Sequence, residues 1–497
     1  MELKGNISWN FLKVIADTLD SYRIRLLIDA KNDIISSEIY DEEQYYQILL
    51  QMIDVERMKY SLFNYLNTEE NHNFKSIKQY SKENSIDIKK TLSFLELLRN
   101  EGLIKVEYIY NNIDTTEGKS SDSTIKDLSI RSSQLIPSEV KSIYEPVKVV
   151  YETNNCSGCG LCAGICPVNC INIYNGFGKL EEDKCIRCGL CYYFCPRTYL
   201  PITLLNMTQK SASKIENFPK IGYYQEVYAA RTKIKEISEV CQDGGISSTC
   251  LYFLFEQNEI DIALGAKMSR TPWRPEPILI KNKEDILKTA GTKYVNNPTL
   301  SLLNDLNKNS SKLAVVGVPC MMQALLKSEI YNIGIPSLNQ VKYRIGIFCM
   351  ESFSYESLLK ICETLNVDIN NIRKTDINKG KFFVYTHEGE ELSIPIKEIS
   401  HLAREDCEIC FDLTSESADI SIGSIGAPSG WNTVIIRTSK GKQLFDGLVK
   451  NDLIEYKNIE EIQPGLPMVE KIANSKRNKC SKHIAKKEGE NKRTPIY

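Results

Sequence analysis

Apolar residues in the first hundred positions recur with the 3.6-residue period of amphipathic helices. One such face comprises Met58, Leu62, Tyr65 and Leu66, and later faces comprise Ile77, Tyr80, Ile86, Ile88, Leu92, Leu95 and Leu98. The period ends at Gly102, and residues 103–108 have the composition of a short strand. The pattern predicts three helices followed by a hairpin in residues 1–110.

Strand-like and helix-like apolar runs alternate in the second half of the chain, which predicts an α/β domain over residues 222–470. Residues 111–144 are rich in Ser, Thr, Asp and Lys and have the composition of a linker. Residues 471–497 are rich in Lys and predict a solvated basic tail suited to an acidic partner. The expected fold class is therefore α+β and α/β multidomain.

The N-terminal order of three helices and a hairpin resembles a winged helix. A DNA-binding member would present a basic recognition helix, but this one carries Asp87, Lys89, Lys90 and Glu96. The whole chain has 62 Lys and Arg against 64 Asp and Glu, which also argues against nucleic acid as the main partner. We therefore expect the N-terminal region to serve docking or structure.

Eight cysteines form two runs of one spacing, each followed by proline. The runs are Cys156-x2-Cys159-x2-Cys162-x3-Cys166 and Cys185-x2-Cys188-x2-Cys191-x3-Cys195. This is the ligand spacing of bacterial two-cluster ferredoxins, in which the fourth cysteine of each run binds the other cluster. It predicts one [4Fe-4S] cluster on Cys156, Cys159, Cys162 and Cys195. The other would be held by Cys166, Cys185, Cys188 and Cys191, in a module spanning residues 145–202.

Zinc knuckles take pairs of ligands rather than runs of four, and a disulfide scaffold suits a small secreted chain rather than one of 497 residues. The chain has seventeen cysteines and no signal-peptide pattern at Met1, and eight of the cysteines are assigned to oxygen-sensitive clusters, so we expect a reducing cytoplasm. Its four histidines argue against an imidazole-based metal site. No apolar run is long enough to span a membrane. Any membrane association would therefore come through a partner.

Four cysteines of the α/β region either follow an apolar run or form a close pair. Cys320 follows the apolar run 313–318, Cys349 follows the run 343–348, and Cys407 and Cys410 form a close pair. Ligands of open α/β sheets bind beyond the carboxyl ends of the strands, which would allow a four-thiolate site. A single C-x-x-C pair also suits zinc or redox chemistry, and a lone cysteine after a strand is commonly a buried apolar residue.

Several short motifs of this region match those of one known protein family. They are Gly317-x-Pro319-Cys320, Phe348-Cys349, Cys407-x-x-Cys410-x-Asp412, Ala418-Asp419-Ile420-Ser421-Ile422-Gly423, Gly430-Trp431-x-Thr433-Val434, and the segments 242–245 and 290–294. Together they resemble the beta subunits of coenzyme F420-reducing hydrogenases and dehydrogenases over residues 223–441. The resemblance implies FAD and one [4Fe-4S] cluster here, with Cys320, Cys349, Cys407 and Cys410 as ligands, and hence three clusters in the chain.

The resemblance also implies flavin contacts from two segments, Gln242, Asp243, Gly244 and Gly245, and Thr292, Lys293 and Tyr294. Neither a G-x-G-x-x-G motif nor a P-loop is present. Two glycines at the start of a helix would let backbone N–H groups approach a phosphate. An ordinary turn and helix cap would have the same sequence.

By this resemblance, the chain would exchange a hydride with coenzyme F420, a 5-deazaflavin, at FAD. Single electrons would then pass through the three clusters to or from redox partner subunits of a larger complex. No catalytic acid or base is expected, because the cofactor carries the chemistry. The alternatives are a polyferredoxin-like electron carrier without its own substrate, a flavin oxidoreductase using NAD(P)H, and a redox-sensing DNA-binding regulator.

Overall fold

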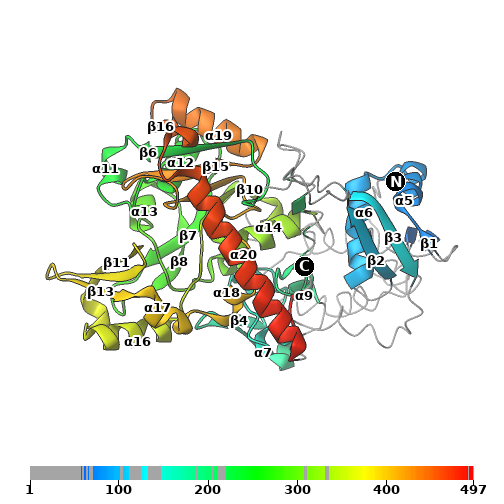
Figure 1. Ribbon diagram of the computed structural model, residues 1–497, viewed down its shortest axis with the longest axis horizontal. Coiled ribbons are helices and arrows are strands. Elements are labelled where there is room, and N and C mark those ends of the chain that lie inside the picture. Colours follow the sequence, from blue (N-terminus) through cyan, green and yellow to red (C-terminus); the bar gives the residue numbers. More distant parts are fainter. Residues whose placement is uncertain are drawn as a thin grey trace, which may run out of the picture.

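The computed structural model describes residues 58, 61–62, 65–66, 71–100, 104–110, 125–132, 147–185, 189–200, 202, 205–206, 209, 220–306, 311–330, 335–490 and 492–495 (Figure 1). An eight-stranded mixed sheet organises the larger part of these residues. In spatial order its strands are β16 (Ile454–Asn458), β6 (Glu226–Thr232), β15 (Asn432–Ile436), β14 (Ile420–Gly423), β10 (Val341–Ile347), β9 (Leu313–Gly317), β7 (Ile262–Met268) and β8 (Pro275–Ile280).

The four central strands, β14, β10, β9 and β7, run parallel, and the flanking strands pair antiparallel. Strands β9 and β10 are neighbours in register, with Val315 opposite Arg344 and Gly317 opposite Gly346. Their carboxyl ends therefore lie at one edge of the sheet. Cys320 and Cys349 follow these two ends directly.

Alternation along the strands assigns side chains to two different cores. Ala263 and Ala314 face one core, whereas their neighbours Leu264 and Val315 face the other, as expected for residues of period two. The first core is covered by α12 (Ile246–Glu256), α13 (Lys283–Lys288) and α19 (Ser439–Lys450). Both faces are thus buried, which explains the apolar runs of the central strands.

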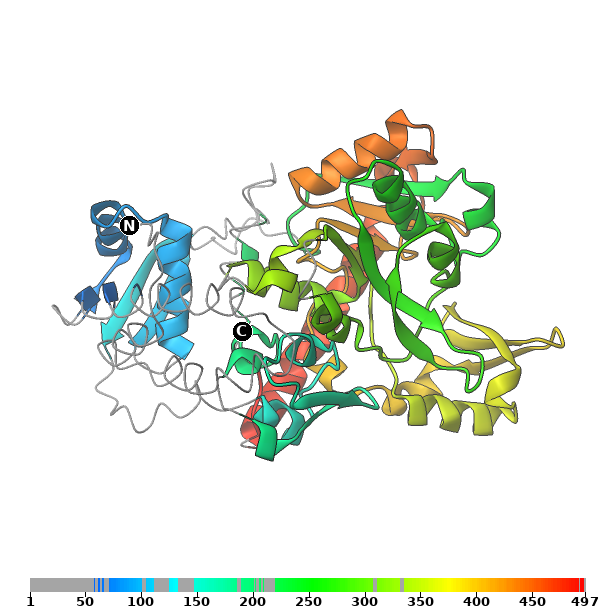
Figure 2. The same cartoon turned by 180° about the vertical axis from the view of Figure 1, so that it is seen from behind.

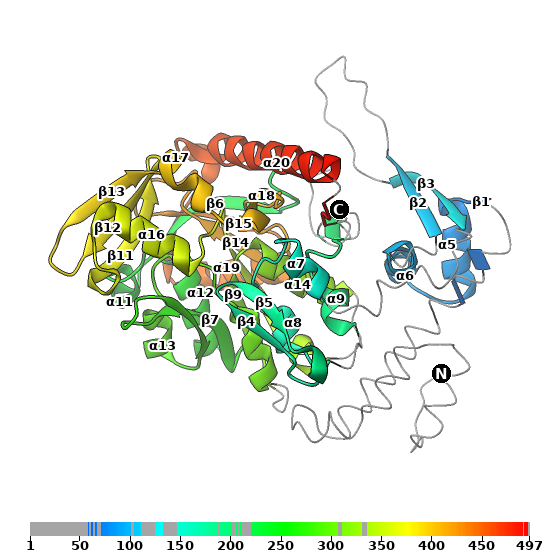
Figure 3. The ribbon, with the colours of Figure 1, turned by 90° about the horizontal axis from the view of Figure 1, so that it is seen from below.

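The opposite face of the sheet carries the elements that position the cysteines. They are α14 (Pro319–Ile330), the 3-10 helix η4 (Thr299–Leu306) and the long helix α20 (Gly465–Gly489). Seen from below, α20 lies along one side of the molecule beside α18 (Glu405–Glu408) (Figure 3).

The cysteine runs of residues 153–197 form a compact module that packs against η4. It comprises α7 (Lys148–Glu152), α8 (Leu161–Gly164), β4 (Ile171–Tyr174), β5 (Phe177–Leu180), η3 (Glu182–Lys184) and α9 (Leu190–Phe194). A Cβ atom on Gly160 would lie 2.6 Å from the carbonyl oxygen of Pro298, and φ of this glycine is +88°. Glycine is required there both by the backbone conformation and by the close approach of η4.

The C-terminal end of α20 also contacts the module (Figures 1 and 2). Asn155 Nδ2 donates to the carbonyl oxygen of Arg493 at 2.8 Å, and Lys487 Nζ donates to Asn155 Oδ1 at 3.2 Å. Arg493 donates to the hydroxyl of Tyr192 at 2.9 Å. Helix α20 thereby joins the module to the α/β domain.

A second small sheet, β11 (Ile372–Asn378), β12 (Lys381–Thr386) and β13 (Glu391–Pro395), lies on α16 (Tyr355–Leu365) and α17 (Ile396–Ile399). Its core is built from Trp273, Phe353, Leu358, Ile372 and Phe382. Strand β11 also brings Lys374 and Asp376 to the segments expected to bind a flavin.

The N-terminal part contains α5 (Phe74–Glu83), α6 (Ile88–Asn100) and a sheet of order β1 (Asn71–His72), β3 (Ile125–Ser132) and β2 (Ile104–Tyr110). The predicted strand at 103–108 is confirmed as β2. The predicted linker at 111–144 is wrong for residues 125–132, which form β3 between β1 and β2. The polar composition of that stretch hid the spaced apolar positions Ile125, Leu128 and Ile130.

The prediction of a solvated basic tail from residue 471 is also wrong for much of that segment. Residues up to Gly489 belong to α20, and Lys476 is buried in spite of its charge. Val469, Ala473 and Cys480 lie buried on the same helix face. The expected fold class agrees with the structure at the level of a mixed α/β multidomain protein.

Candidate metal centres and cofactor site

The structure brings Cys156, Cys159, Cys162 and Cys195 together, as the sequence predicts. The first three flank the start of α8, and Cys195 follows α9. Burial raises the pKa of Cys159, and the nearby sulfurs of Cys162, Cys195 and Cys156 raise it further. Four thiols this close would repel one another as thiolates unless a positively charged group lay between them.

Several donors point at these sulfurs. The N–H of Gly158 donates to Cys156 Sγ at 3.3 Å, and the N–H of Arg197 donates to Cys195 Sγ at 3.4 Å. The hydroxyl of Tyr151 lies 3.0 Å from Cys162 Sγ. Hydrogen bonds to cluster sulfurs are one of the means by which proteins set cluster potentials.

The second run places Cys166 and Cys185 close together, and Cys191 lies in the same small core. The N–H of Val147 donates to Cys191 Sγ at 3.4 Å. Cys188 lies outside the described residues. Cys170 belongs to neither predicted ligand run, and its sulfur lies 3.4 Å from Cys166 Sγ.

The third set draws four cysteines from three separate loops. Cys320 begins α14 after β9, Cys349 follows β10, and Cys407 and Cys410 lie at α18. Burial raises the pKa of Cys349 to about 11, with further contributions from Cys410 and Asp406, while Lys476 lowers it. Burial also raises the pKa of Cys320, which the sulfur of Cys410 raises further. All four thiols therefore lie near the carboxyl ends of β9 and β10.

A buried ion network separates the third set from the first ferredoxin set. Arg404 Nε donates to Asp406 Oδ1 at 2.9 Å, and Arg197 lies 3.8 Å from the other carboxylate oxygen. Arg404 also donates to the carbonyl oxygens of Cys156 at 2.6 Å and Gly176 at 2.9 Å. Asp406 therefore links the two arginines across the boundary of the module.

Helix α14 joins the same two sets of cysteines. Cys320 lies in its first turn, and Lys327 donates to the carbonyl oxygens of Cys195 and Tyr199, both at 2.7 Å. Seven residues of helix rise by about 10 Å. One rigid element thus contacts both sets.

These arrangements fit the clusters that the sequence implies. Each set combines buried thiols with backbone N–H donors or basic groups. Burial favours the neutral thiol, whereas these donors and the iron of a bound cluster would favour the thiolate that ligation requires. Among the described residues, no three His, Cys, Asp or Glu side chains are grouped tightly enough to hold a single metal ion. The four cysteines of a cuboidal cluster bind different irons and lie farther apart.

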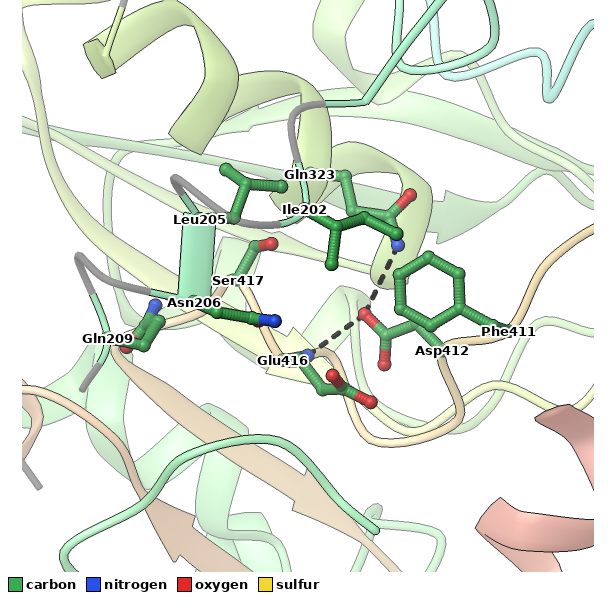
Figure 4. A pocket seen from close by; sticks show the side chains of 9 residues that line it. All are labelled: Ile202, Leu205, Asn206, Gln209, Gln323, Phe411, Asp412, Glu416 and Ser417. Carbon is green, nitrogen blue, oxygen red and sulfur yellow. Dashed lines mark hydrogen bonds between the residues drawn. The ribbon is translucent and has the colours of Figure 1, made fainter. Parts of the chain in front are cut away.

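A small polar pocket lies beside the third set (Figure 4). Its lining includes Gln209, Gln323, Asp412 and Glu416. Asp412 Oδ2 accepts from the N–H of Glu416 at 2.9 Å and from Gln323 Nε2 at 3.3 Å. Glu416 also forms an ion pair with Arg477 of α20.

Glu416 is expected to make stability depend on pH. Burial raises its pKa from 4.5 to about 7, while Arg477 opposes the shift and Asp412 adds to it. The folded state therefore holds this proton more tightly than the unfolded state does, so stability should fall as pH rises from 4.5 to 7. Relative to native protein, Glu416→Gln should show less of this decline in anaerobic urea unfolding. Identical pH profiles for the two proteins would contradict the assignment.

The segments expected to bind a flavin lie together near β11. Gly245 begins α12 with φ of +72°, and a Cβ atom on Gly291 would lie 4.0 Å from Gln242 Oε1. Burial raises the pKa of Asp243, as does Asp376, while Lys374 lowers it. The hydroxyl of Tyr294 accepts from the N–H of Ile377 at 3.0 Å. The turns at Gly245 and Gly291 and the charged strand β11 thus lie around the expected flavin site. Thr292 directly follows Gly291 in the chain.

The amide of Gln242 gives an observation in favour of a bound group there. Both its Nε2 and Oε1 atoms are buried, and neither has a hydrogen-bond partner. Buried amides without partners are rare in native proteins and commonly mark a place where a ligand or water completes the site. The residues therefore fit a polar, hydrogen-bonding cofactor such as a flavin ring.

The side chain of Lys293, which was expected to contact the flavin, turns back toward the backbone of the preceding residues. Its Nζ atom donates to the carbonyl oxygens of Thr289, Ala290 at 3.0 Å and Gly291 at 2.8 Å, which follow α13. Burial lowers its pKa to about 7. In this geometry Lys293 shapes the turn that holds Gly291.

We expect Gln242→Leu to weaken FAD retention about tenfold, the effect of losing one or two hydrogen bonds to the cofactor. Retention is measured by titrating flavin into deflavinated protein. Gln257→Leu, an exposed position at the end of α12, is the matched control and should bind as native protein does. Equal affinity for the Gln242 variant would remove this residue from the site.

Comparison with known proteins agrees with this geometry. Residues 227–304 and 310–462 match the N-terminal and C-terminal regions described as coenzyme F420 hydrogenase/dehydrogenase, beta subunit. The coenzyme F420 hydrogenase subunit beta of Methanosarcina barkeri is 37% identical over 54% of this chain and 93% of that protein. The chain belongs to the family of coenzyme F420 hydrogenase/dehydrogenase beta subunits. Residues 153–169 and 179–197 also match 4Fe-4S binding domains.

Two other members of this family cover more of the chain. One subunit of the F420H2 dehydrogenase of Methanosarcina mazei is 34% identical over 67% of this chain and 93% of that protein. The coenzyme F420-dependent sulfite reductase of Methanocaldococcus jannaschii is 30% identical over 70% of this chain and 53% of that protein.

A solved structure of the F420-reducing [NiFe] hydrogenase complex from Methanosarcina barkeri, studied by xenon derivatization, contains a chain that matches in fold. It has 36% identity, a TM-score of 0.54, and coverage of 56% of this chain and 97% of the other. Within the described residues, no helix is both long and apolar enough to cross a membrane.

Proposed function

We propose that this chain is the electron-input component of a coenzyme F420-dependent oxidoreductase, with FAD and three [4Fe-4S] clusters. The observation that carries the proposal is the placement of the third cysteine set. It lies at the carboxyl edge of the sheet, with α14 extending from it to the first ferredoxin set. Family membership supports the enzyme class, and the two 4Fe-4S binding domains support the ferredoxin module.

When bound, a flavin converts between hydride transfer, the only mode open to a deazaflavin, and the single-electron transfer that clusters perform. The chain's own residues supply the framework for that conversion. Gln242 and the turns at Gly245 and Gly291 would hold the cofactor, and the third set would be the first to receive its electrons. The sulfur of Cys159 lies close enough to raise the pKa of Cys320, and α14 connects Cys320 to the backbone of Cys195 through Lys327. The first ferredoxin cluster would therefore come next in the electron path.

The second ferredoxin cluster, at Cys166, Cys185, Cys188 and Cys191, would then exchange electrons with a partner subunit. The relatives named above include a hydrogenase subunit, a dehydrogenase subunit and a sulfite reductase. Their names specify three different redox activities that all involve coenzyme F420. We infer a larger complex for this chain as well, with the winged-helix-like N-terminal region serving as a docking element rather than binding DNA.

The test is anaerobic purification followed by iron, sulfide and flavin quantitation, and then addition of reduced coenzyme F420. About twelve irons and one FAD per chain, with rapid bleaching of flavin and cluster absorbance, are expected. About eight irons without flavin would leave only a ferredoxin-like carrier. A flavin that ignores reduced coenzyme F420 and responds to NADH would overturn the substrate.

A further inference from the structure

Two lysines are fully or almost fully buried beside the predicted clusters. Lys327 of α14 is 0% exposed, and Lys476 of α20 is 4% exposed. Each donates to the backbone carbonyl of a predicted cluster ligand, Lys327 to Cys195 at 2.7 Å and Lys476 to Cys349 at 2.6 Å. The chain thus repeats one arrangement at two different cysteine sets.

The partners of the two lysines are neutral. Lys476 also donates to the carbonyl oxygen of Asp412 at 2.8 Å, and Lys327 donates to that of Tyr199 and lies 3.5 Å from the centre of its ring. Within the described part of the chain, neither lysine forms an ion pair with a carboxylate. A buried ammonium with only neutral partners is strongly disfavoured, so each lysine needs a nearby negative charge to remain protonated.

The cysteine sets supply that charge. Lys476 lies against the backbone of Cys349 and of Asp412, two residues beyond Cys410, and Lys327 lies against the backbone of Cys195. A [4Fe-4S] core bound by four thiolates is a net anion, and its reduction adds one electron without requiring a proton. A fixed cation beside it favours the reduced form.

The two contacts of Lys476 also have a geometric consequence. Cys349 lies on the loop after β10, and Asp412 lies two residues beyond Cys410, so one ammonium group joins two of the three loops of the third set. Helix α20 begins at Gly465, beyond residue 462, where the family match ends. The lysine therefore lies on an element that the family comparison does not assign.

We propose that Lys476 and Lys327 are positioning residues whose buried positive charges raise the reduction potentials of the third cluster and the first ferredoxin cluster, respectively. The inference rests on the proposed function, because it requires clusters at both sets. One lysine would thus raise the reduction potential of each cluster. The reduced flavin of the proposed function is the electron donor in the enzyme, and dithionite replaces it in the test.

The experiment is an anaerobic reductive titration of the holoprotein followed by EPR and resolved into one-electron components. Lys476→Met should make one component about tenfold less reduced at a fixed potential, equivalent to about 59 mV for a one-electron couple. Lys327→Met should shift a different component by a similar amount. Lys476→Arg, which keeps the charge, should remain close to native, and so should the exposed control Lys482→Met on the same helix.

The iron content of the native protein distinguishes a failure of the proposed function from a failure of the proposed role of the lysines. Native protein with only about eight irons would refute the proposed function itself. A full complement of iron with unchanged potentials in both Met variants would refute only the role of the lysines. An equal shift in Lys476→Arg and Lys476→Met would indicate disturbed packing instead of charge and would also overturn the inference.

A second measurement applies if the Met variants lose their clusters. After chelation of iron from native protein, Lys476 lacks its counter-charge, so amide hydrogen exchange in α20 should accelerate strongly. Apo Lys476→Met contains no such buried charge, and α20 should exchange more slowly in it than in apo native protein. Equal exchange of α20 in the two apo proteins would contradict the proposal.

Discussion

A Cys410→Ala variant is expected to accept hydride from reduced coenzyme F420 but to pass electrons to the ferredoxin clusters at least about 100-fold more slowly than native protein. Loss of an outer partner of a metal site commonly costs 10–100-fold, and loss of a ligand should cost more. The flavin site at Gln242 and Gly291 does not include Cys410, so flavin reduction should persist. Stopped-flow absorbance separates the two steps.

The matched control is Cys250→Ala, because Cys250 is a buried cysteine of α12 that lies away from all three sets. It should retain both phases and full iron. If the Cys410 variant keeps about twelve irons and reduces its ferredoxin clusters at the native rate, the third set is not part of the electron path.

Asp406→Asn should lower the free energy of unfolding by about 3–5 kcal/mol, the usual cost of breaking a buried ion pair. The carboxylate is 3% exposed and lies between Arg404 and Arg197, so the variant would leave two buried cations without their shared partner. Anaerobic urea unfolding measures the change, with a fall in midpoint of about 1 M or more expected.

An exposed aspartate provides the comparison. Asp446 pairs with Lys442 one helical turn away on α19, and Asp446→Asn should cost about 1 kcal/mol or less. If Asp406→Asn were as mild as this surface variant, the network would not hold the ferredoxin module against the α/β domain.

The gathering of the first ferredoxin cysteines could be predicted from sequence because their geometry is local. Cys156, Cys159 and Cys162 lie within one loop, and the spacing itself determines which way the thiols face. The edge position of Cys320 and Cys349 was also predictable, since each follows an apolar run that forms a parallel strand. Flavin contacts gave a weaker signal, because a glycine turn before a helix is common in proteins that bind nothing.

The buried charges could not be predicted in the same way. Arg404 contacts the carbonyl oxygen of Cys156 across 248 residues of sequence, and no local pattern indicates that contact. Lys476 was obscured by the many lysines around it, so composition suggested a solvated tail. The spacing of Val469, Ala473 and Cys480 was the available signal, since it places small apolar residues on one helix face that also carries Lys476.

The long-range contact of Arg404 has a consequence for how the protein is made. The ferredoxin cysteines are complete at Cys195, whereas the arginine that covers their loop is synthesised roughly 200 residues later, or about 10–40 s at usual rates of translation. During that interval the first loop is open on the side that the α/β domain later covers. The loop that carries Cys156 would therefore remain accessible to iron and sulfide until the α/β domain folds over it.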